Sequence, residues 1–126
     1  MKVIYVAGPF SGETAWDVEQ NIRRAEELAY YVSCLGAAPL CPHSNTRFFN
    51  GTHTYEFWID ATAALLAKCD AIIMTPDWER SSGARKEHAQ ALRDAIPIFY
   101  HLQTLQGWLD TSDIKFAHTL AQTRIA

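Results

Sequence analysis

Short apolar runs alternate along this chain with longer segments of helical periodicity. The apolar runs cover residues 2–7, 37–41, 71–74 and 97–100. The helical segments cover residues 16–35, 55–68 and 84–95. Prolines follow the first three apolar runs and stop them early, so each run predicts a short strand. Strands that alternate with helices predict right-handed crossovers and a parallel sheet.

The predicted fold is a three-layer α/β domain, with a parallel sheet of four to five strands and helices on both faces. A chain of 126 residues is close to the commonest domain size, so we expect one domain. Its core would end near residue 101, and residues 102–126 would form a C-terminal extension of one broken or two short helices. Thr14 and Asp17 suit the start of the first helix, and Gly36 suits its end. The segment 55–68 is apolar around most of its circumference, so we expect it to be well buried.

The overall charge argues against a protein that holds long nucleic acid. The formal net charge is −3 and the isoelectric point is near 5.9, whereas binding to a phosphate backbone needs a basic face. A small anionic ligand held by backbone amides and one or two arginines stays compatible with this charge. Three cysteines without CxxC spacing and the lack of a signal-peptide pattern favour a cytoplasmic protein. No apolar run approaches the roughly 20 residues that cross a membrane.

Polar and glycine-containing segments follow three of the predicted strands. They are Gly8-Pro9-Phe10-Ser11-Gly12, then Pro42-His43-Ser44-Asn45, and then Asp77-Trp78 with Ser81-Ser82-Gly83. The carboxyl ends of parallel strands share one edge of the sheet, so these segments should meet in one cleft. Ser82 suits the N-cap of the third helix, and its exposed amides suit an anion, although simple capping explains the serine equally well.

Glu87 is the most informative carboxylate. Ala84, Glu87, Ala91 and Ala95 share one stripe of the third helix, and a carboxylate on a packing face needs a partner or a task. A salt bridge and a catalytic role are both compatible with this pattern. Asp60 raises the same question on the preceding helix, where a solvated helix edge is the simpler explanation.

The remaining polar and aromatic candidates leave their roles open. His43 could be a general acid, a ligand contact or a partner of a backbone carbonyl. Trp78 and the Phe48-Phe49 pair could stack on a base or mark a subunit interface. The histidines and cysteines show no metal-site spacing, so no metal is predicted.

These motifs together resemble the nucleoside deoxyribosyltransferase superfamily, including its small nucleoside-monophosphate N-glycosidases. The resemblance covers residues 2 to about 100. It rests on Ile4-Tyr5-Val6-Ala7-Gly8-Pro9-Phe10, Pro42-His43, Asp60, Cys69-Asp70-Ala71-Ile72 and Ser81-Ser82-Gly83-Ala84-Arg85-Lys86-Glu87, in this order and spacing. It implies a flavodoxin-like sheet, a homo-oligomer of at least two subunits and no cofactor.

The resemblance also implies roles for single residues. Glu87 matches the family's nucleophile, Asp60 its second acidic residue and Tyr5 the tyrosine beside the glutamate, while Asp77 loosely matches a contact to the base. The phosphate-binding positions correspond to Gly8, Ser11, Gly12, Ser81 and Gly83. We therefore expect an enzyme that cleaves the N-glycosidic bond of a nucleoside or its 5′-monophosphate. Base exchange between nucleosides and a non-catalytic nucleotide-binding module are the alternatives.

Overall fold

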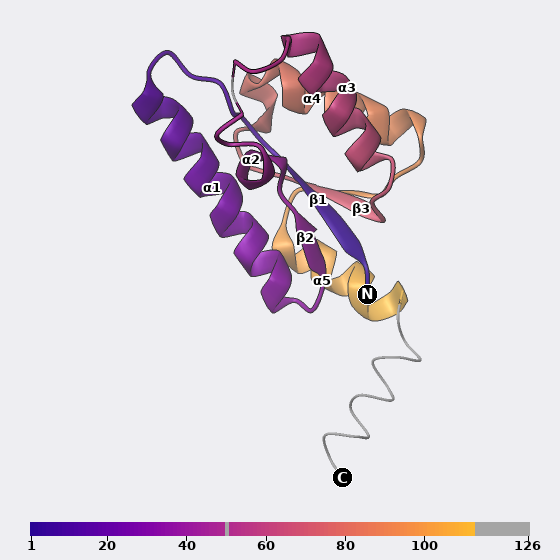
Figure 1. Cartoon of the computed structure of the whole chain (residues 1–126). Coiled ribbons are helices and arrows are strands. Elements are labelled where there is room, and N and C mark those ends of the chain that lie inside the picture. The colour runs from indigo at the N-terminus through magenta and orange to yellow at the C-terminus, as the bar shows by residue number, and fades with distance from the viewer. Residues whose placement is uncertain (50, 113–126) are drawn as a thin grey trace.

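The computed structural model describes residues 1–49 and 51–112 of the chain, drawn in Figure 1. Its strands are β1 (Val3–Ala7), β2 (Ala38–Leu40), β3 (Ala71–Met74) and β4 (Ile98–Phe99). Its helices are α1 (Ala15–Cys34), α2 (Pro42–Asn45), α3 (Tyr55–Leu66), the 3-10 helix η1 (Trp78–Arg80), α4 (Ser82–Arg93) and α5 (Leu102–Ser112). All four predicted strands are present. The short helix α2 lies where the sequence predicted only a loop.

The sheet is parallel throughout, with the strand order β2-β1-β3-β4. In the register of its centre, Tyr5 of β1 lies opposite Leu40 of β2 and Ile72 of β3. The strand β2, which ends at Leu40 just before Pro42, is an edge strand, as the proline and the short apolar run predicted. The fold class predicted from the alternation of strands and helices is confirmed.

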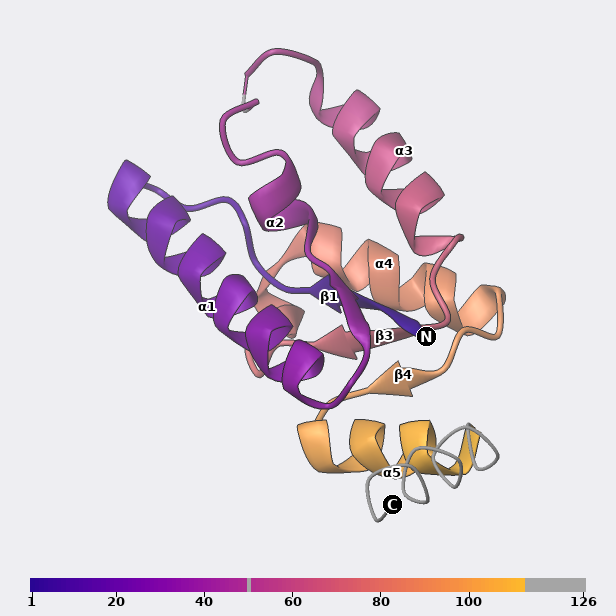
Figure 2. The same ribbon diagram turned by 60° about the horizontal axis from the view of Figure 1, so that its bottom comes forward.

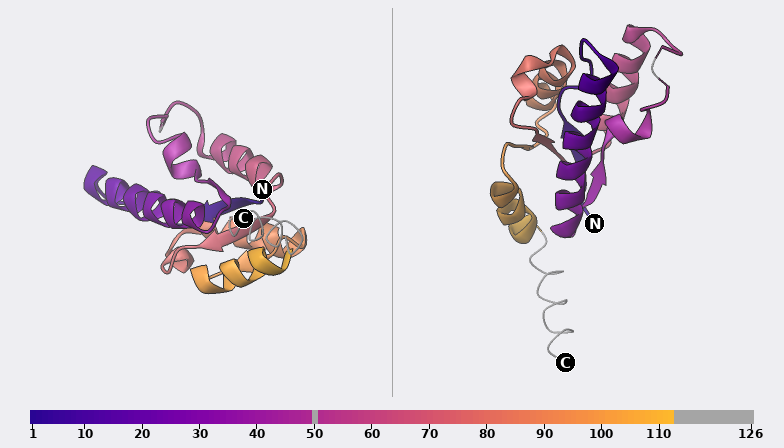
Figure 3. Two further views of the ribbon diagram at one scale, coloured as in Figure 1. Left: turned by 90° about the horizontal axis from the view of Figure 1, so that it is seen from below. Right: turned by 90° about the vertical axis from the view of Figure 1, so that its left-hand side faces the viewer.

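The two faces of the sheet carry separate cores, because successive strand residues point to opposite sides. Ile4 and Val6 of β1 pack against α1 and α5 on one face. Tyr5 and Ala7 of the same strand pack with α4 and the end of α3 on the other face. Figure 2 shows α4 behind β1 and β3 and α5 beside β4, and Figure 3 shows α1 running along β2.

The ends of α1 match their sequence signals. The Thr14 side chain accepts a hydrogen bond from the Asp17 amide, and the Asp17 carboxylate accepts one from the Thr14 amide. This reciprocal pair is a capping box, which satisfies two amides that the helix leaves unpaired. Gly36 follows the helix with φ of 87°, a left-handed conformation that glycine adopts without a steric cost.

The prediction that the segment 55–68 is well buried is wrong. Within α3 only Leu66 is buried, while the side chains of Tyr55 and Phe57 are 52% and 46% exposed. The reason is tertiary, because only the last turn of α3 joins the core of the sheet. Its first two turns instead form a wall of the cavity described below.

The third predicted helix begins and ends two residues earlier than the sequence suggested. It spans Ser82–Arg93 and is capped by Ser81, so the prediction that Ser82 is the N-cap is also wrong. Ala95 lies beyond the helix end with φ of 55°, so it does not belong to the stripe of Ala84, Glu87 and Ala91.

The start of the predicted C-terminal extension is a helix, α5, which packs on the α1 face through Leu105 and Leu109. Residues 113–126 of that extension lie outside the described residues. Among the helices of the described part, none is long and apolar enough to span a membrane.

Candidate functional site

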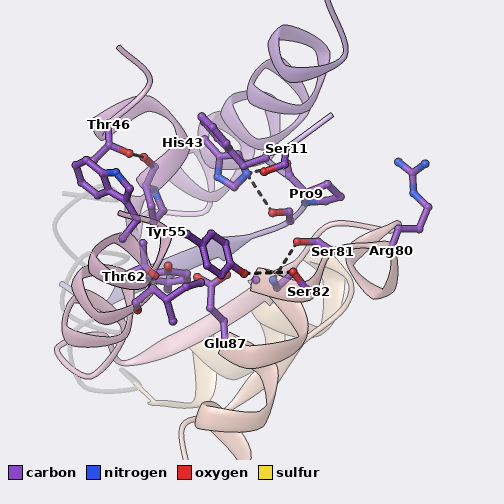
Figure 4. Close-up of a pocket in the computed structure, with 18 residues that line it drawn as sticks. Pro9, Ser11, His43, Thr46, Tyr55, Thr62, Arg80, Ser81, Ser82 and Glu87 are labelled. Carbon is purple, nitrogen blue, oxygen red and sulfur yellow. Dashed lines mark hydrogen bonds between the residues drawn. The ribbon is translucent and has the colours of Figure 1, made fainter. Parts of the chain in front are cut away.

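A cavity of about 310 Å³ opens at the carboxyl ends of β1 and β3. Its walls come from the loop after β1, from α2, from the first two turns of α3 and from the start of α4, as Figure 4 shows. The convergence of three strand-end segments, predicted from the parallel topology, is therefore present in the structure.

Glu87 projects into this cavity from the second turn of α4. Its neighbours on the same stripe, Ala84 and Ala91, are buried against the sheet, and their small side chains let α4 approach it closely. Burial raises the pKa of the Glu87 carboxyl to about 7, while the neighbouring Tyr5 hydroxyl acts in the opposite direction. Glu87 forms no salt bridge among the described residues, which removes the salt-bridge explanation for this carboxylate.

Tyr5 lies beneath Glu87 at the centre of the sheet. The residue is 0% exposed, and its hydroxyl has no hydrogen-bond partner of normal geometry. Burial, and then the charge of Glu87, raise the pKa of Tyr5. The side chain is therefore a neutral phenol whose proton is free to point towards the carboxylate.

The N-terminus of α4 forms one end of the cavity. The Ser81 hydroxyl caps the helix by accepting a hydrogen bond from the Ala84 amide at 3.1 Å. The Ser82 hydroxyl lies 3.3 Å from that of Tyr55, and Arg80 also lines the cavity. A helix N-terminus with hydroxyls beside it is suited to an anion. The Arg80 guanidinium is paired with Asp77 and points away from the serines in Figure 4, so it adds a positive charge near this end.

Close approach explains two of the predicted loop glycines. A Cβ on Gly8 would lie 2.5 Å from the side chain of Thr75, and one on Gly12 would lie 2.5 Å from the Cβ of Asp17. Gly8, Pro9, Phe10 and Ser11 line the cavity, whereas Gly12 lines a neighbouring hollow. By contrast, a Cβ on Gly83 would meet nothing closer than 3.8 Å, so packing within the chain does not require this glycine.

Hydrogen bonds from two other elements hold the loop after β1. The amide group of Asn21, on α1, donates to the carbonyl oxygens of Phe10 and Ser11, both at 3.1 Å. His43, on α2, lies with Nε2 at 3.1 Å from the Gly8 oxygen and 2.9 Å from the Pro9 oxygen. Burial lowers the pKa of His43, which favours the neutral imidazole.

One wall of the cavity consists of residues that the sequence analysis did not select. Tyr55, Trp58, Ile59 and Thr62 all line it from α3. Their i, i+3, i+4, i+7 spacing places them on one helix face, and this spacing was the available signal. Arg80, which directly precedes the predicted Ser81-Ser82-Gly83 segment, and Thr46 were missed as well.

Besides Gly12, three of the predicted site residues do not line this cavity. Asp60 is exposed, because it projects from a different side of α3 than the cavity-facing residues. The Asp77 carboxylate instead accepts hydrogen bonds from Thr75 Oγ1 at 2.8 Å and from Arg80 at 2.7 Å. Trp78 stacks on His88 with ring centroids 4.3 Å apart, so its face is already covered. The placement of these side chains does not support the roles predicted for them.

The Phe48-Phe49 pair lies near the α3 wall. Phe49 stacks on Trp58 with centroids 6.2 Å apart, while Phe48 is 84% exposed. Within residues 1–49 and 51–112, no group of three or more histidine, cysteine, aspartate or glutamate side chains could hold a metal ion. The chemistry available in the cavity is that of one desolvated carboxyl, a phenol, an imidazole and a helix N-terminus suited to an anion.

Comparison with known proteins gives two findings. Residues 2–100 match the family described as "Domain of unknown function (DUF4406)". Among solved structures, the chain is similar to a 2-deoxyribosyltransferase from the psychrotolerant bacterium Bacillus psychrosaccharolyticus. That match has a TM-score of 0.54 and 18% identity and covers 76% of this chain and 69% of the other. No curated protein matches. At this identity the similarity shows a shared fold, and it confirms the deoxyribosyltransferase-like fold that the sequence motifs implied.

Proposed function

The chain belongs to the DUF4406 family, and on that premise we propose that its cavity binds a nucleoside 5′-monophosphate and cleaves the N-glycosidic bond, with Glu87 as nucleophile. The observation that carries this proposal is a desolvated carboxyl, with pKa of about 7, in a cavity that also contains a helix N-terminus suited to an anion. The fold shared with a 2-deoxyribosyltransferase supports glycosidic chemistry.

The reaction has two steps. The ionised Glu87 carboxylate forms a bond to C1′ of the sugar as the C1′–N bond breaks, and the base leaves with that electron pair and takes a proton from solvent. Water then attacks C1′, the bond from C1′ to the Glu87 oxygen breaks with its electron pair returning to the carboxylate, and the proton of the attacking water passes to solvent as the sugar 5-phosphate leaves. The cavity volume of about 310 Å³ is at the lower end of the range for small-molecule sites.

Each end of the substrate has a matching wall. The phosphate would lie at Ser81, Ser82 and Gly83 with the Arg80 guanidinium beside it, since amides and cations at a helix N-terminus bind anions. The base would lie against the aromatic side chains of α3, where Trp58 and Tyr55 provide apolar surface. Tyr5 would hold the Glu87 carboxylate in place by donating its phenolic proton.

The test is to incubate the protein with a panel of nucleosides and their 5′-monophosphates and to measure free base by chromatography. Glu87→Gln should reduce base release on the order of 10³-fold or more, because the nucleophile is lost. Glu56→Gln, which changes an exposed glutamate of α3, is the matched control and should be as active as the wild type. Base release by Glu87→Gln at the wild-type rate would overturn the proposal.

Base transfer is the second candidate, favoured by the fold shared with a 2-deoxyribosyltransferase. It differs only in the second step, in which another base attacks C1′ in place of water. Adding a second base to the reaction and looking for the new nucleoside separates the two. Tight binding of a monophosphate with no base release would instead indicate the non-catalytic nucleotide-binding module.

The expected homo-oligomer belongs to the same proposal. Exposed aromatic side chains at Tyr55, Phe57 and Phe48 give the region around α3 an apolar surface of the kind that subunit interfaces bury. Light scattering should therefore give a mass of at least two chains, each of 14.2 kDa. A mass equal to that of one chain would contradict this part.

A further inference from the structure

Three buried polar side-chain atoms among the described residues have no hydrogen-bond partner. They are the Tyr5 hydroxyl, His43 Nδ1 and Trp58 Nε1, and all three residues line the cavity. Buried polar atoms without partners are uncommon in folded proteins, because desolvation without a hydrogen bond is unfavourable. The Tyr5 hydroxyl can turn to the neighbouring Glu87 carboxylate, which leaves His43 Nδ1 and Trp58 Nε1 as the atoms at this cavity that a bound molecule could partner.

His43 allows the kind of missing partner to be deduced. Its Nε2 lies 3.1 Å from the Gly8 oxygen and 2.9 Å from the Pro9 oxygen. Carbonyl oxygens only accept hydrogen bonds, so Nε2 must carry the proton that both of them share. A lone pair at Nε2 would instead face two other lone pairs at close range.

The other ring nitrogen follows from this assignment. The His43 residue is 7% exposed, and this burial disfavours the charged imidazolium more than the nearby Glu26 carboxylate favours it. In a neutral imidazole with its proton on Nε2, Nδ1 is an acceptor. A buried acceptor without a partner in the chain is suited to a donor from a bound ligand.

On the basis of the proposed function, we infer that His43 Nδ1 accepts a hydrogen bond from an O–H or N–H donor of the bound nucleotide. In a nucleoside monophosphate these donors are the sugar hydroxyls and an exocyclic amino group of the base. Figure 4 shows the His43 ring across the cavity from Glu87. Since Glu87 is the proposed nucleophile at C1′, a group across the cavity from it is placed to meet the sugar or the base.

The assignment also excludes one role. A neutral His43 with its only proton held by two backbone carbonyls has none to give to a leaving base, so it is a binding residue and not a general acid. The same side chain fixes the loop after β1 through Nε2. Recognition of the ligand and positioning of the loop are thus assigned to different nitrogens of one ring.

The tautomer can be measured without any enzymatic activity. In the ¹⁵N-labelled, ligand-free protein, long-range ¹H–¹⁵N spectra should show His43 with a protonated Nε2 and an unprotonated Nδ1. Saturating nucleoside monophosphate should then shift the Nδ1 resonance in the direction of hydrogen bonding. A protonated Nδ1 in the free protein, or an Nδ1 resonance that saturating ligand leaves unchanged, would overturn the inference.

Two variants separate the roles of the two nitrogens. Glutamine places its amide nitrogen near the position of Nε2, so His43→Gln keeps a donor for the Gly8 and Pro9 carbonyls but removes the acceptor. Asparagine places its amide oxygen near the position of Nδ1, so His43→Asn keeps the acceptor and loses the donor. Thermal unfolding should show a larger loss of stability for His43→Asn, while His43→Gln stays folded.

The ligand donor is identified by binding measurements on the Glu87→Gln background, where turnover does not consume the ligand. The probes are nucleoside 5′-monophosphates that lack the 2′-hydroxyl, the 3′-hydroxyl or the exocyclic amino group in turn. With His43 present, removal of the correct donor should weaken binding by about five- to tenfold, the usual contribution of one hydrogen bond. With His43→Gln, binding should be weaker by a similar factor and should no longer depend on that donor.

The outcomes distinguish this inference from the function on which it rests. His43→Gln could weaken the binding of every probe equally, with each missing donor still reducing affinity as much as it does when His43 is present. That result would overturn the contact to Nδ1 but leave nucleotide binding in place. If no monophosphate binds at all, the proposed function fails together with the nucleotide as the source of the donor.

Discussion

On one face of the sheet, the long helix α1 and the helix α5 cover the strands with a continuous apolar core. On the other face, α4 packs closely through Ala84 and Ala91, while α3 joins the core only at Leu66. The first face is closed along the strands, whereas the second opens at their carboxyl ends. That opening is where Glu87 and Tyr5 meet the cavity.

This comparison separates residues that maintain the fold from residues that form the site. On the closed face, an apolar side chain has neighbours on all sides, so its loss leaves a void. On the open face, a polar side chain such as Glu87 is desolvated without a full set of partners. Substitutions on the closed face should therefore lower stability and leave activity unchanged, whereas substitutions on the open face should lower activity with little loss of stability.

The largest effect on stability is expected for Leu105→Ala on the closed face. Leu105 is 0% exposed, so the substitution should lower the free energy of unfolding by about 2–5 kcal/mol. Base release by the remaining folded protein should be unchanged, because α5 does not line the cavity. Urea unfolding and kinetic measurements below the transition check both parts. A loss of activity without a loss of stability would show that the two faces are not independent.

The pH dependence should reveal the desolvated carboxyl on the open face. Only ionised Glu87 can act as the proposed nucleophile, so kcat/KM should rise with pH through its pKa of about 7, with a slope of about tenfold per unit below that value. The effect of pH on the stability contributed by Glu87 has the opposite direction to its effect on kcat/KM. Because the folded-state pKa is raised above the ordinary value of 4.5, the contribution of Glu87 to stability is greatest below that value and falls as pH rises to about 7.

The matched measurement is the unfolding of Glu87→Gln. At pH 8 this variant should be at least as stable as the wild type, since a buried charge is removed. A marked loss of stability at that pH would show that the carboxylate is paired in solution and is not held ready for reaction.

The anion-binding end of the cavity should respond to Arg80→Ala. Removal of this guanidinium should raise KM for a nucleoside 5′-monophosphate by about tenfold, while leaving KM for the nucleoside unchanged. Arg93→Ala, in the last turn of α4 and away from the cavity, is the control for loss of positive charge. Equal effects of both variants would indicate long-range attraction and not a contact at the phosphate.

The smallest effects are expected from two glycines that differ in their surroundings. Gly36 has φ of 87° with nothing within 4 Å of a Cβ, so Gly36→Ala should cost about 1–2 kcal/mol of stability from backbone strain alone and leave activity unchanged. Gly83 lies within α4, where alanine stabilises a helix by up to about 1 kcal/mol. Gly83→Ala should therefore retain stability yet weaken monophosphate binding, because the added methyl enters the anion end of the cavity.

Local signals were sufficient for most of the fold. The runs of apolar residues located the four strands, the Thr14 and Asp17 pattern located the start of α1, and Gly36 located its end. The spacing of Ala84, Glu87 and Ala91 placed a carboxylate on a packing face, which is where the structure has it. Each of these features depends on neighbours along the chain, so the sequence contains the necessary information.

The errors share a different origin. Composition predicted that α3 is buried, whereas most of it is not. The family resemblance suggested roles for Asp60 and Asp77, and its strand-end position suggested Trp78, but none of the three lines the cavity. Burial of α3 depends on how far the helix tilts from the sheet, which its own residues do not specify. Asp77 and Trp78 are satisfied by local partners, Arg80 and His88, that compete with a ligand.

By itself, the sequence determined the order of strands and helices, the parallel sheet and the convergence of strand-end loops, because periodicity and turn residues are local properties. Only the tertiary structure decided which side chains share the cavity, how strongly burial shifts the pKa of Glu87 and which nitrogen of His43 is left without a partner. Desolvation and hydrogen bonding depend on groups that are distant in the chain, and these groups meet only when the domain folds.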